Sequence, residues 1–305
     1  MTSTTQVPQT TAGEVRRDGA RPTAPDRRRP VRGRRVRRAA NVFAVVTSLL
    51  WFFPIYWMIS SALLPNEQFR SSTPVFVTTH PTAEHFAGVL GDERFWSAMT
   101  VSMQVTAISV VVAVSLAFLA AVAISRFRFR GRKAVIGCVL VIQMIPAEAL
   151  FISQYKMLDG WGLLDNVVGL SVLYVGIIIP FNIWILKGFV DGVPQELEQA
   201  AMIDGCTRVQ AFVRITLPLL GPGLVTGAIF ATILAWNEYT LALVVMSDGN
   251  QTLPLWLQYF SGANQATNWG GIMAGSLLIA LPVIALFMTV QTRMAAGLTA
   301  GAVKG

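Results

Sequence analysis

Charged residues are scarce in this chain of 305 residues. Asp, Glu, Lys and Arg together make up 13% of it, whereas hydrophobic residues make up 53%. A soluble domain carries about 25% charged residues, so the chain has roughly half of what a surface in contact with water requires. The composition therefore excludes an ordinary cytosolic protein.

Residues for nucleotide, metal and nucleophilic chemistry are also scarce. The sequence has no G-x-x-x-x-G-K-[ST] loop for a nucleoside triphosphate and no H-E-x-x-H motif. Its only histidines, His80 and His85, stand in what we expect to be a solvated outer loop. Its only cysteines, Cys138 and Cys206, are expected at different depths facing a reducing compartment, which argues against a disulfide. We therefore expect no catalytic residue, metal site or cofactor in this chain.

Long apolar stretches dominate the remaining sequence. A bilayer core about 30 Å thick requires about 20 predominantly apolar residues of α-helix. Six stretches are long enough, and each contains at most one charged residue. We therefore predict an all-α polytopic membrane protein with six transmembrane helices. The expected spans are approximately residues 39–64, 95–125, 134–155, 166–186, 222–247 and 271–292.

Basic residues are concentrated on one side of these predicted spans. If the N-terminus is cytoplasmic, the inner segments carry 21 of the 24 Lys and Arg residues. Only Arg70, Arg94 and Lys156 then fall on the outer side. This asymmetry predicts a multi-pass membrane protein with both termini in the cytoplasm.

Residues 1–38 differ in composition from the rest of the chain. They hold 11 Arg, three acidic residues and no aromatic residue, whereas basic and acidic residues balance over residues 39–305. Nucleic-acid binding is an alternative for this segment, but it has no aromatic side chain to stack on a base. We predict a disordered basic tail that holds the N-terminal end of the first span on the cytoplasmic side of the membrane. A transmembrane domain over residues 39–305 follows it.

A first short helix is predicted within the cytoplasmic segment 191–218, between the fourth and fifth spans. Pro194 suits its first position, and Glu196 and Glu198 lie near its positive N-terminal end. Gly205 suits its C-terminal stop. An amphipathic hairpin lying on lipid is the alternative, but an anionic inner leaflet repels acidic side chains. We therefore expect this helix to contact a soluble protein partner.

A second short helix is predicted directly after this glycine. Thr207 and Gln210 have the spacing of a capping box. Apolar residues including Val209 and Phe212 follow, and we expect the helix to end before Pro218. The segment should thus form a hairpin of two short helices joined by a glycine turn.

The hairpin sequence QAAMIDGCTRVQAFVRITLP resembles the EAA loop of ATP-binding-cassette importer permeases. That motif reads E-A-A, three residues, Gly, nine residues and I-x-L-P. Gln199 departs from the usual Glu, which leaves open whether Gln199, Glu198 or Glu196 makes the polar contact of the loop. The matching positions are Gln199, Ala200, Ala201, Gly205, Ile215, Leu217 and Pro218.

Two further stretches narrow this resemblance. AWNEYTLAL at residues 235–243 is similar to the fifth-helix sequence of the sugar-importer branch. QTRMAAGLTAGAVKG at residues 291–305 is similar to the C-terminus of its maltose-permease-G-like subunits. The resemblance runs from about the first span to the last residue and excludes residues 1–38.

The resemblance implies a type I importer permease of the bacterial plasma membrane that is not itself an enzyme. Such a subunit pairs with a second homologous permease, while an extracytoplasmic solute-binding protein or lipoprotein docks outside. Two copies of a separate ATPase subunit bind ATP and magnesium, and the EAA loop transmits their closure to the membrane helices. The residues that this implies for coupling are Glu196, Glu198, Gln199, Ala200, Ala201, Asp204, Gly205, Leu217 and Pro218.

Polar side chains within the spans are the candidates for a substrate pathway. A carboxylate at mid-bilayer costs roughly 2.5–3.5 kcal/mol, so it usually faces a cavity or a partner. Glu148 and Glu238 are predicted at a similar depth in the outer half, with Gln143 and Asn237 near them. Carboxylates and amides suit sugar hydroxyls, but a role in the interface with the second permease remains an equal alternative.

Three other functions are weighed against a carbohydrate importer subunit. The solute could be a polyol or glycerol phosphate, although these spans lack the cationic residues that a phosphate favours. A membrane-embedded enzyme would need a reactive pair at one depth, for which only Glu148 and Glu238 qualify. A passive channel would have no need of an acidic docking helix on the inner face.

Overall fold

The structure is a computed structural model that describes residues 32–69, 74–261 and 267–302. It divides into two units, residues 1–53 and 54–305. In the first unit the described residues belong to helix α1 (Arg32–Ala62), which begins earlier than the predicted span. Most of the predicted basic tail, residues 1–31, lies outside the described part of the chain.

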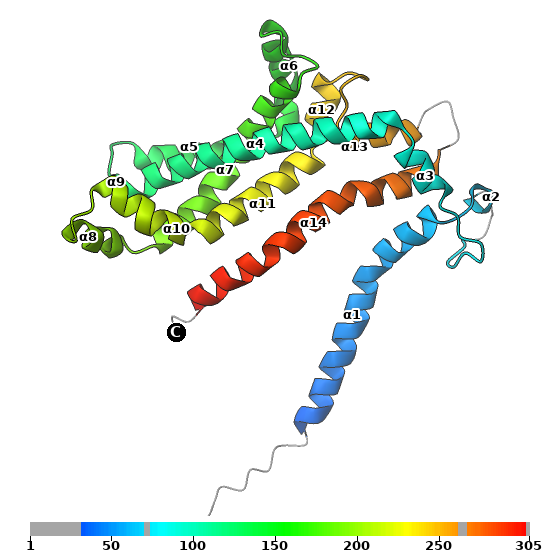
Figure 1. Cartoon of the computed structure of the whole chain (residues 1–305), viewed down its shortest axis with the longest axis horizontal. Helices are drawn as coiled ribbons and strands as arrows, with labels where there is room; N and C mark the ends of the chain where they lie inside the picture. Colours follow the sequence, from blue (N-terminus) through cyan, green and yellow to red (C-terminus); the bar gives the residue numbers. More distant parts are fainter. Residues whose placement is uncertain (1–31, 70–73, 262–266, 303–305) are drawn as a thin grey trace, which may run out of the picture. The chain divides into compact units, whose positions relative to one another are not determined.

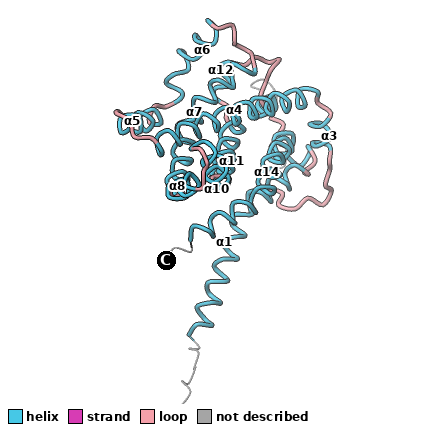
Figure 2. The backbone as a smooth tube through the Cα atoms, turned by 60° about the vertical axis from the view of Figure 1, so that its left-hand side comes forward, coloured by secondary structure: helices cyan, strands magenta, loops and turns pink. Residues whose placement is uncertain are grey.

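Three long helices form the centre of the second unit: α4 (Glu93–Arg126), α7 (Val167–Gly192) and α11 (Gly221–Asn237). Figures 1 and 2 show α4 and α7 side by side, with α11 packed against both. Ala113, Ala117 and Ala121 recur every four residues on one face of α4 and are fully buried. Such small side chains allow helix backbones to approach closely, which favours van der Waals packing in a membrane.

Glycines allow a similarly close approach of the backbones of α11 and α7. A Cβ atom added to Gly223 would lie 2.5 Å from the ring of Phe189, and one added to Gly227 would lie 2.7 Å from Asn182 Oδ1. These two glycines, four residues apart near the start of α11, therefore serve close helix packing.

Two of the predicted spans are broken. α5 (Arg132–Gln143) is followed by a 3-10 turn, η1 (Ala147–Leu150), and by α6 (Phe151–Gly160), with a bend of 92°. The fifth span ends at Asn237, and a separate short helix, α12 (Thr240–Val245), occupies its predicted outer end. Among the described residues, four helices can cross a membrane alone, or up to six spans result if two bent pairs are each counted as one span. These pairs are Arg132–Gln143 with Ala147–Gly160, and Arg208–Leu219 with Gly221–Asn237, which are bent by 63°.

Short helices gather at the end of the second unit where α4 begins: α2 (Asn66–Phe69), α3 (Glu84–Leu90), α13 (Leu253–Trp256) and the 3-10 turn η3 (Leu257–Ser261) (Figure 1). The last helix, α14 (Trp269–Ala302), starts at this same end and packs against α11.

The expectation that His85 is solvated is wrong. Only 5% of His85 is exposed, and its Nε2 atom lies 2.9 Å from the carbonyl oxygen of Leu64. A Cβ atom on Gly270 would lie 2.2 Å from the imidazole ring, so α14 approaches this histidine closely. His80, in contrast, is exposed.

Candidate functional site

The predicted hairpin is present at the end of the second unit where α4 ends (Figure 1). Its first arm, α8 (Gln195–Ile203), begins one residue after Pro194, which serves as the N-cap instead of the first helical residue. Gly205 ends this arm with a φ of +93°, and the Cys206 N–H donates back to the Ala201 carbonyl at 3.0 Å. This left-handed glycine and its backward hydrogen bond are typical of a helix C-terminus.

The second arm starts as predicted. The Gln210 N–H donates to Thr207 Oγ1 at 3.3 Å, and the Thr207 N–H donates to Gln210 Oε1 at 2.9 Å, which completes a capping box. The chain then continues through α9 (Arg208–Ala211), a π-helical turn η2 (Phe212–Thr216) and α10 (Leu217–Leu219).

The predicted end of this arm before Pro218 is wrong, because the helix runs on to Leu219. In a regular α-helix the ring of Pro218 would clash with the carbonyl group four residues earlier. The π-helical turn lies directly ahead of this proline, and its wider geometry makes room for the ring. The arm therefore continues as a helix through Pro218.

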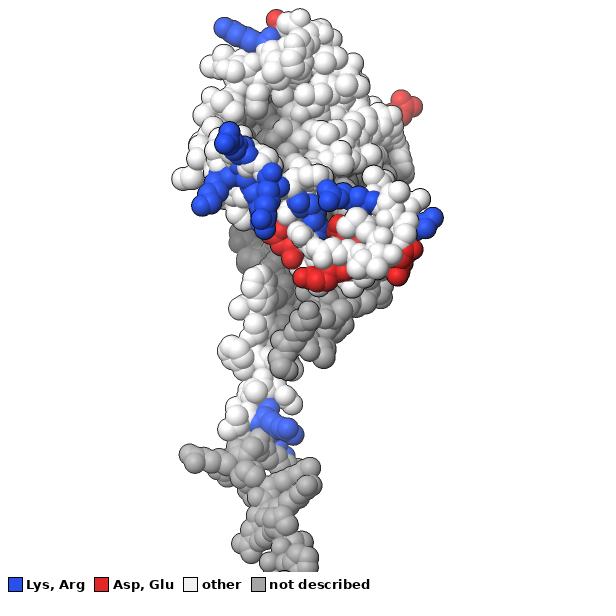
Figure 3. All heavy atoms as spheres, turned by 90° about the vertical axis from the view of Figure 1, so that its left-hand side faces the viewer, with Lys and Arg blue, Asp and Glu red and all other residues white. Residues whose placement is uncertain are grey.

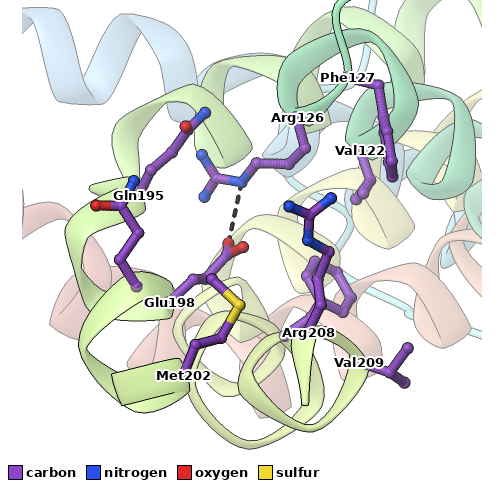
Figure 4. Close-up of a pocket in the computed structure, with 10 residues that line it drawn as sticks. Val122, Arg126, Phe127, Gln195, Glu198, Met202, Arg208 and Val209 are labelled. Atoms are coloured by element: carbon purple, nitrogen blue, oxygen red, sulfur yellow. Dashed lines mark ion pairs between the residues drawn. The ribbon is translucent and has the colours of Figure 1, made fainter. Parts of the chain in front are cut away.

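A nearly buried ion pair fixes the hairpin to the end of α4 (Figure 4). Arg126 Nε lies 3.1 Å from Glu198 Oε1, and the two side chains are only 10% and 15% exposed. The Nε–H does not point at the carboxylate, so this contact is an ion pair and not an aligned hydrogen bond. The second arm joins the network because the Thr216 hydroxyl donates to the same Glu198 oxygen at 2.7 Å.

The same guanidinium also holds the start of the hairpin. Arg126 Nη2 donates to the Val193 carbonyl at 3.0 Å, where α7 ends and α8 begins. One arginine thus contacts both the entry to the hairpin and its first arm. We name Arg126, Val193, Glu198 and Thr216 together the Arg126 clamp.

The remaining predicted coupling residues divide between the inner and outer sides of the hairpin. Ala201 is buried and Leu217 is partly buried, as packing between the arms requires. The residues that remain exposed are Glu196, Gln199, Ala200, Asp204, Gly205 and Pro218. Figure 3 shows acidic side chains along this end of the molecule next to a group of basic ones. Because Glu198 is engaged inside the clamp, Glu196 and Gln199 are the candidates for an external polar contact.

Two exposed apolar residues at the tip were not predicted as contact residues. Ile203 is 86% exposed and Val209 is 72% exposed. In α8 the inward face passes through Glu198 and Ala201, three residues apart, which places Ile203 on the outward face. Both apolar side chains flank the Gly205 turn and are accessible at the tip of the hairpin.

A pocket of about 320 Å³ lies beside the clamp, between the end of α4 and both arms of the hairpin. Figure 4 shows the side chains of Arg126, Glu198 and Arg208 around it, together with Met202. Val122 and Phe212 supply part of its apolar wall.

The structure does not bring the four predicted pathway residues together. Gln143 lines a pocket of about 420 Å³ with residues of α6 and α7, whereas Asn237 lines a different one of about 380 Å³ between α11, α13 and α14. Glu148 is exposed in the η1 turn. Similar predicted depth therefore did not place these side chains in one cavity.

Glu238 acts as the cap of a short helix. Its Oε1 atom accepts from the Leu241 N–H at 2.9 Å and its Oε2 atom accepts from the Ala242 N–H at 3.3 Å. The carboxylate thus satisfies the second and third amides of α12 from the residue before the N-cap position, which Tyr239 occupies. The Tyr174 hydroxyl donates to the Glu238 carbonyl at 3.2 Å. These contacts also explain why the fifth span ends at Asn237.

Residues 113–299 match the model of a family described as binding-protein-dependent transport system inner membrane component. The match covers more than half of the chain and includes both arms of the hairpin. The chain therefore belongs to this family of transport permeases.

Two curated relatives are similar over almost their whole length. The diacetylchitobiose uptake system permease protein DasC of Streptomyces coelicolor is 43% identical over 266 residues, which cover 87% of this chain and 96% of DasC. The trehalose transport system permease protein SugB of Mycobacterium tuberculosis is 35% identical over 273 residues, which cover 88% of this chain and 99% of SugB.

A solved structure has the same fold. A chain in the crystal structure of a bacterial ABC transporter involved in the import of the acidic polysaccharide alginate superposes with a TM-score of 0.72. The superposition covers 88% of this chain and 99% of that chain, at 22% sequence identity. At this identity the similarity establishes the fold alone.

Proposed function

We propose that this chain is one permease subunit of an ATP-driven importer for a carbohydrate. It forms half of the translocation pathway, and a second homologous permease forms the other half. The observation that carries the proposal is the hairpin of a family permease, which presents acidic and apolar side chains at its tip while the Arg126 clamp holds it to the membrane helices. The uptake of sugars by relatives such as DasC and SugB supports a carbohydrate as the solute.

In this proposal the hairpin is the contact for a separate ATPase subunit, which binds the ATP and magnesium. Glu196 and Asp204 are exposed acidic residues that suit a basic surface on the ATPase. Ile203 and Val209 supply apolar area at the centre of the contact. An extracytoplasmic solute-binding protein delivers the sugar to the opposite end.

The proposed orientation places the hairpin and both termini in the cytoplasm. The excess of Lys and Arg in the inner segments supports this orientation. It also places the short helices α3 and α13 at the outer surface, since they lie at the end of α4 away from the hairpin.

The test is reconstitution of the chain with its second permease, ATPase and binding protein in proteoliposomes. We expect uptake of a labelled sugar, and this uptake should require ATP on the side of the membrane where the hairpin lies. The double variant Ile203→Asp/Val209→Asp should lose co-purification of the ATPase at unchanged membrane levels. Val77→Asp is the matched control, because Val77 is 72% exposed and lies outside the hairpin. Normal ATPase binding by the double variant would contradict the proposed docking site.

A further inference from the structure

The Arg126 clamp connects the hairpin to a helix that is not its neighbour along the chain. The hairpin is joined covalently to α7 and α11 only. Arg126, the last residue of α4, adds a third connection through the Val193 carbonyl and the Glu198 carboxylate. Thr216 on the second arm binds the same carboxylate, so α4 is held to both arms.

The opposite end of α4 reaches the short helix α13. Ser102 Oγ accepts from the Leu253 N–H at 2.8 Å, and the ring of Phe95 lies 5.2 Å from the ring of Trp256. α4 has 34 residues, so it spans about 50 Å at 1.5 Å per residue. One continuous helix therefore joins the hairpin to α13.

α13 borders two adjacent pockets away from the hairpin. Pro254 lines the pocket of about 380 Å³ that includes Asn237, and it also lines a second pocket of about 470 Å³ that includes Tyr239. A displacement of α4 along its axis would move one wall of both pockets.

We propose that Arg126 is a positioning residue that makes α4 the rod carrying hairpin displacement to the α13 pockets. The proposal rests on the proposed function, in which the ATPase moves the hairpin. The planar guanidinium reaches Val193 and Glu198 at once, whereas a lysine ammonium is a compact charge without this rigid fork. Arg126 is therefore required for transmission, and Glu198 acts inside the protein and not on the ATPase.

The experiment uses the full complex in proteoliposomes with Arg126→Lys, Arg126→Gln and Glu198→Gln. The expected result is a drop of about tenfold or more in sugar imported per ATP hydrolysed, while ATPase co-purification stays within about twofold of wild type. Arg130→Lys and Arg130→Gln are the matched controls, since Arg130 is an exposed arginine in the loop after α4. They should retain wild-type coupling.

A second measurement reports on the rod itself. Spin labels at Val213 in the second arm of the hairpin and at Phe129 beyond the end of α4 are both on exposed positions, and neither residue belongs to the proposed ATPase contact. In the otherwise wild-type complex, their separation should stay constant between nucleotide-free and ATP-bound states. In Arg126→Gln it should change between the two states, because the hairpin moves without α4.

Two outcomes would overturn the proposal. Wild-type coupling in Arg126→Lys, Arg126→Gln and Glu198→Gln at normal membrane levels would show that the clamp transmits nothing. Loss of ATPase binding together with coupling would show that the clamp serves only to fold the docking surface. Failure of the wild-type complex to bind the ATPase or import sugar would instead refute the proposed function.

Discussion

Asp165 and Ser247 join the loop before α7 to the loop after α12 through two hydrogen bonds. Asp165 Oδ1 accepts from the Ser247 backbone N–H at 2.9 Å, and Oδ2 accepts from the Ser247 hydroxyl at 2.7 Å. The Asp165 N–H donates to the carbonyl of Val245, the last residue of α12, at 2.9 Å, which adds a third contact. Asp165 has a φ of +52°, a conformation that Asp and Asn adopt more readily than other residues with a side chain.

The first prediction concerns the pH dependence of this contact. Burial would raise the pKa of Asp165, but the hydrogen bonds that it accepts from Ser247 outweigh burial and hold the pKa below its usual value. A lowered folded-state pKa contributes stability above the unfolded value of about 3.9, and that stability is lost as pH falls through the folded value. We expect the thermal unfolding midpoint in detergent to decrease as the pH is lowered from about 5 to about 3.

Asp165→Asn is the matched variant for this measurement, because Asn tolerates the same left-handed backbone. It should have a lower midpoint than wild type at about pH 6 and lose part of the dependence on pH below 5. An identical pH profile in the two proteins would show that the carboxylate charge contributes nothing.

The second prediction concerns the turn of the hairpin. Gly205 has a φ of +93° and open space around the position of a Cβ atom, so any cost of a side chain arises from the backbone. We expect Gly205→Ala to cost about 1–2 kcal/mol of hairpin stability and to reduce ATP-dependent uptake. Gly188→Ala is the control, since Gly188 in α7 also has open space and no positive φ. Equal uptake by the two variants would contradict a role for the left-handed turn.

The hairpin itself was largely predictable because its signals are local. Thr207 and Gln210 form the capping box, and Gly205 forms the turn, as their spacing indicates. The same local view assigned the wrong C-terminal end, because the π-helical turn before Pro218 is a small rearrangement without a composition signal. Local signals thus predicted the two arms and the turn between them, but not the continuation of the helix through Pro218.

Contacts between distant segments were not predictable in the same way. Nothing in the spacing of residues pairs Arg126 with Glu198, since one ends α4 and the other lies in α8. Hydropathy indicated that Glu148 and Glu238 lie at a similar depth, but it does not indicate toward which side of a helix each side chain points. In the structure Glu148 is exposed, whereas the Glu238 carboxylate accepts hydrogen bonds from amides of α12. A single sequence, without an alignment of related sequences, carries little information on such pairings.

The third prediction uses the two histidines. His85 is buried against Leu64 and Gly270, whereas His80 is exposed. His85→Ala removes a buried ring and leaves the Leu64 carbonyl without this partner, so we expect a loss of about 1–3 kcal/mol in the free energy of unfolding. His80→Ala should leave unfolding unchanged. Thermal unfolding in detergent checks both, and an equal midpoint for the two variants would contradict the buried position of His85.

The fourth prediction separates a capping role of Glu238 from a direct role in sugar binding. As a cap, its carboxylate accepts from two backbone amides of α12, so Glu238→Ala should cost about 1 kcal/mol of stability. Glu238→Gln keeps one acceptor oxygen and should retain most of the stability and of the uptake. If the carboxylate instead binds sugar, the Gln variant should have normal stability but a raised KM for uptake. Measuring thermal midpoint and KM on both variants therefore distinguishes the two roles, and we expect KM to change little in Glu238→Gln.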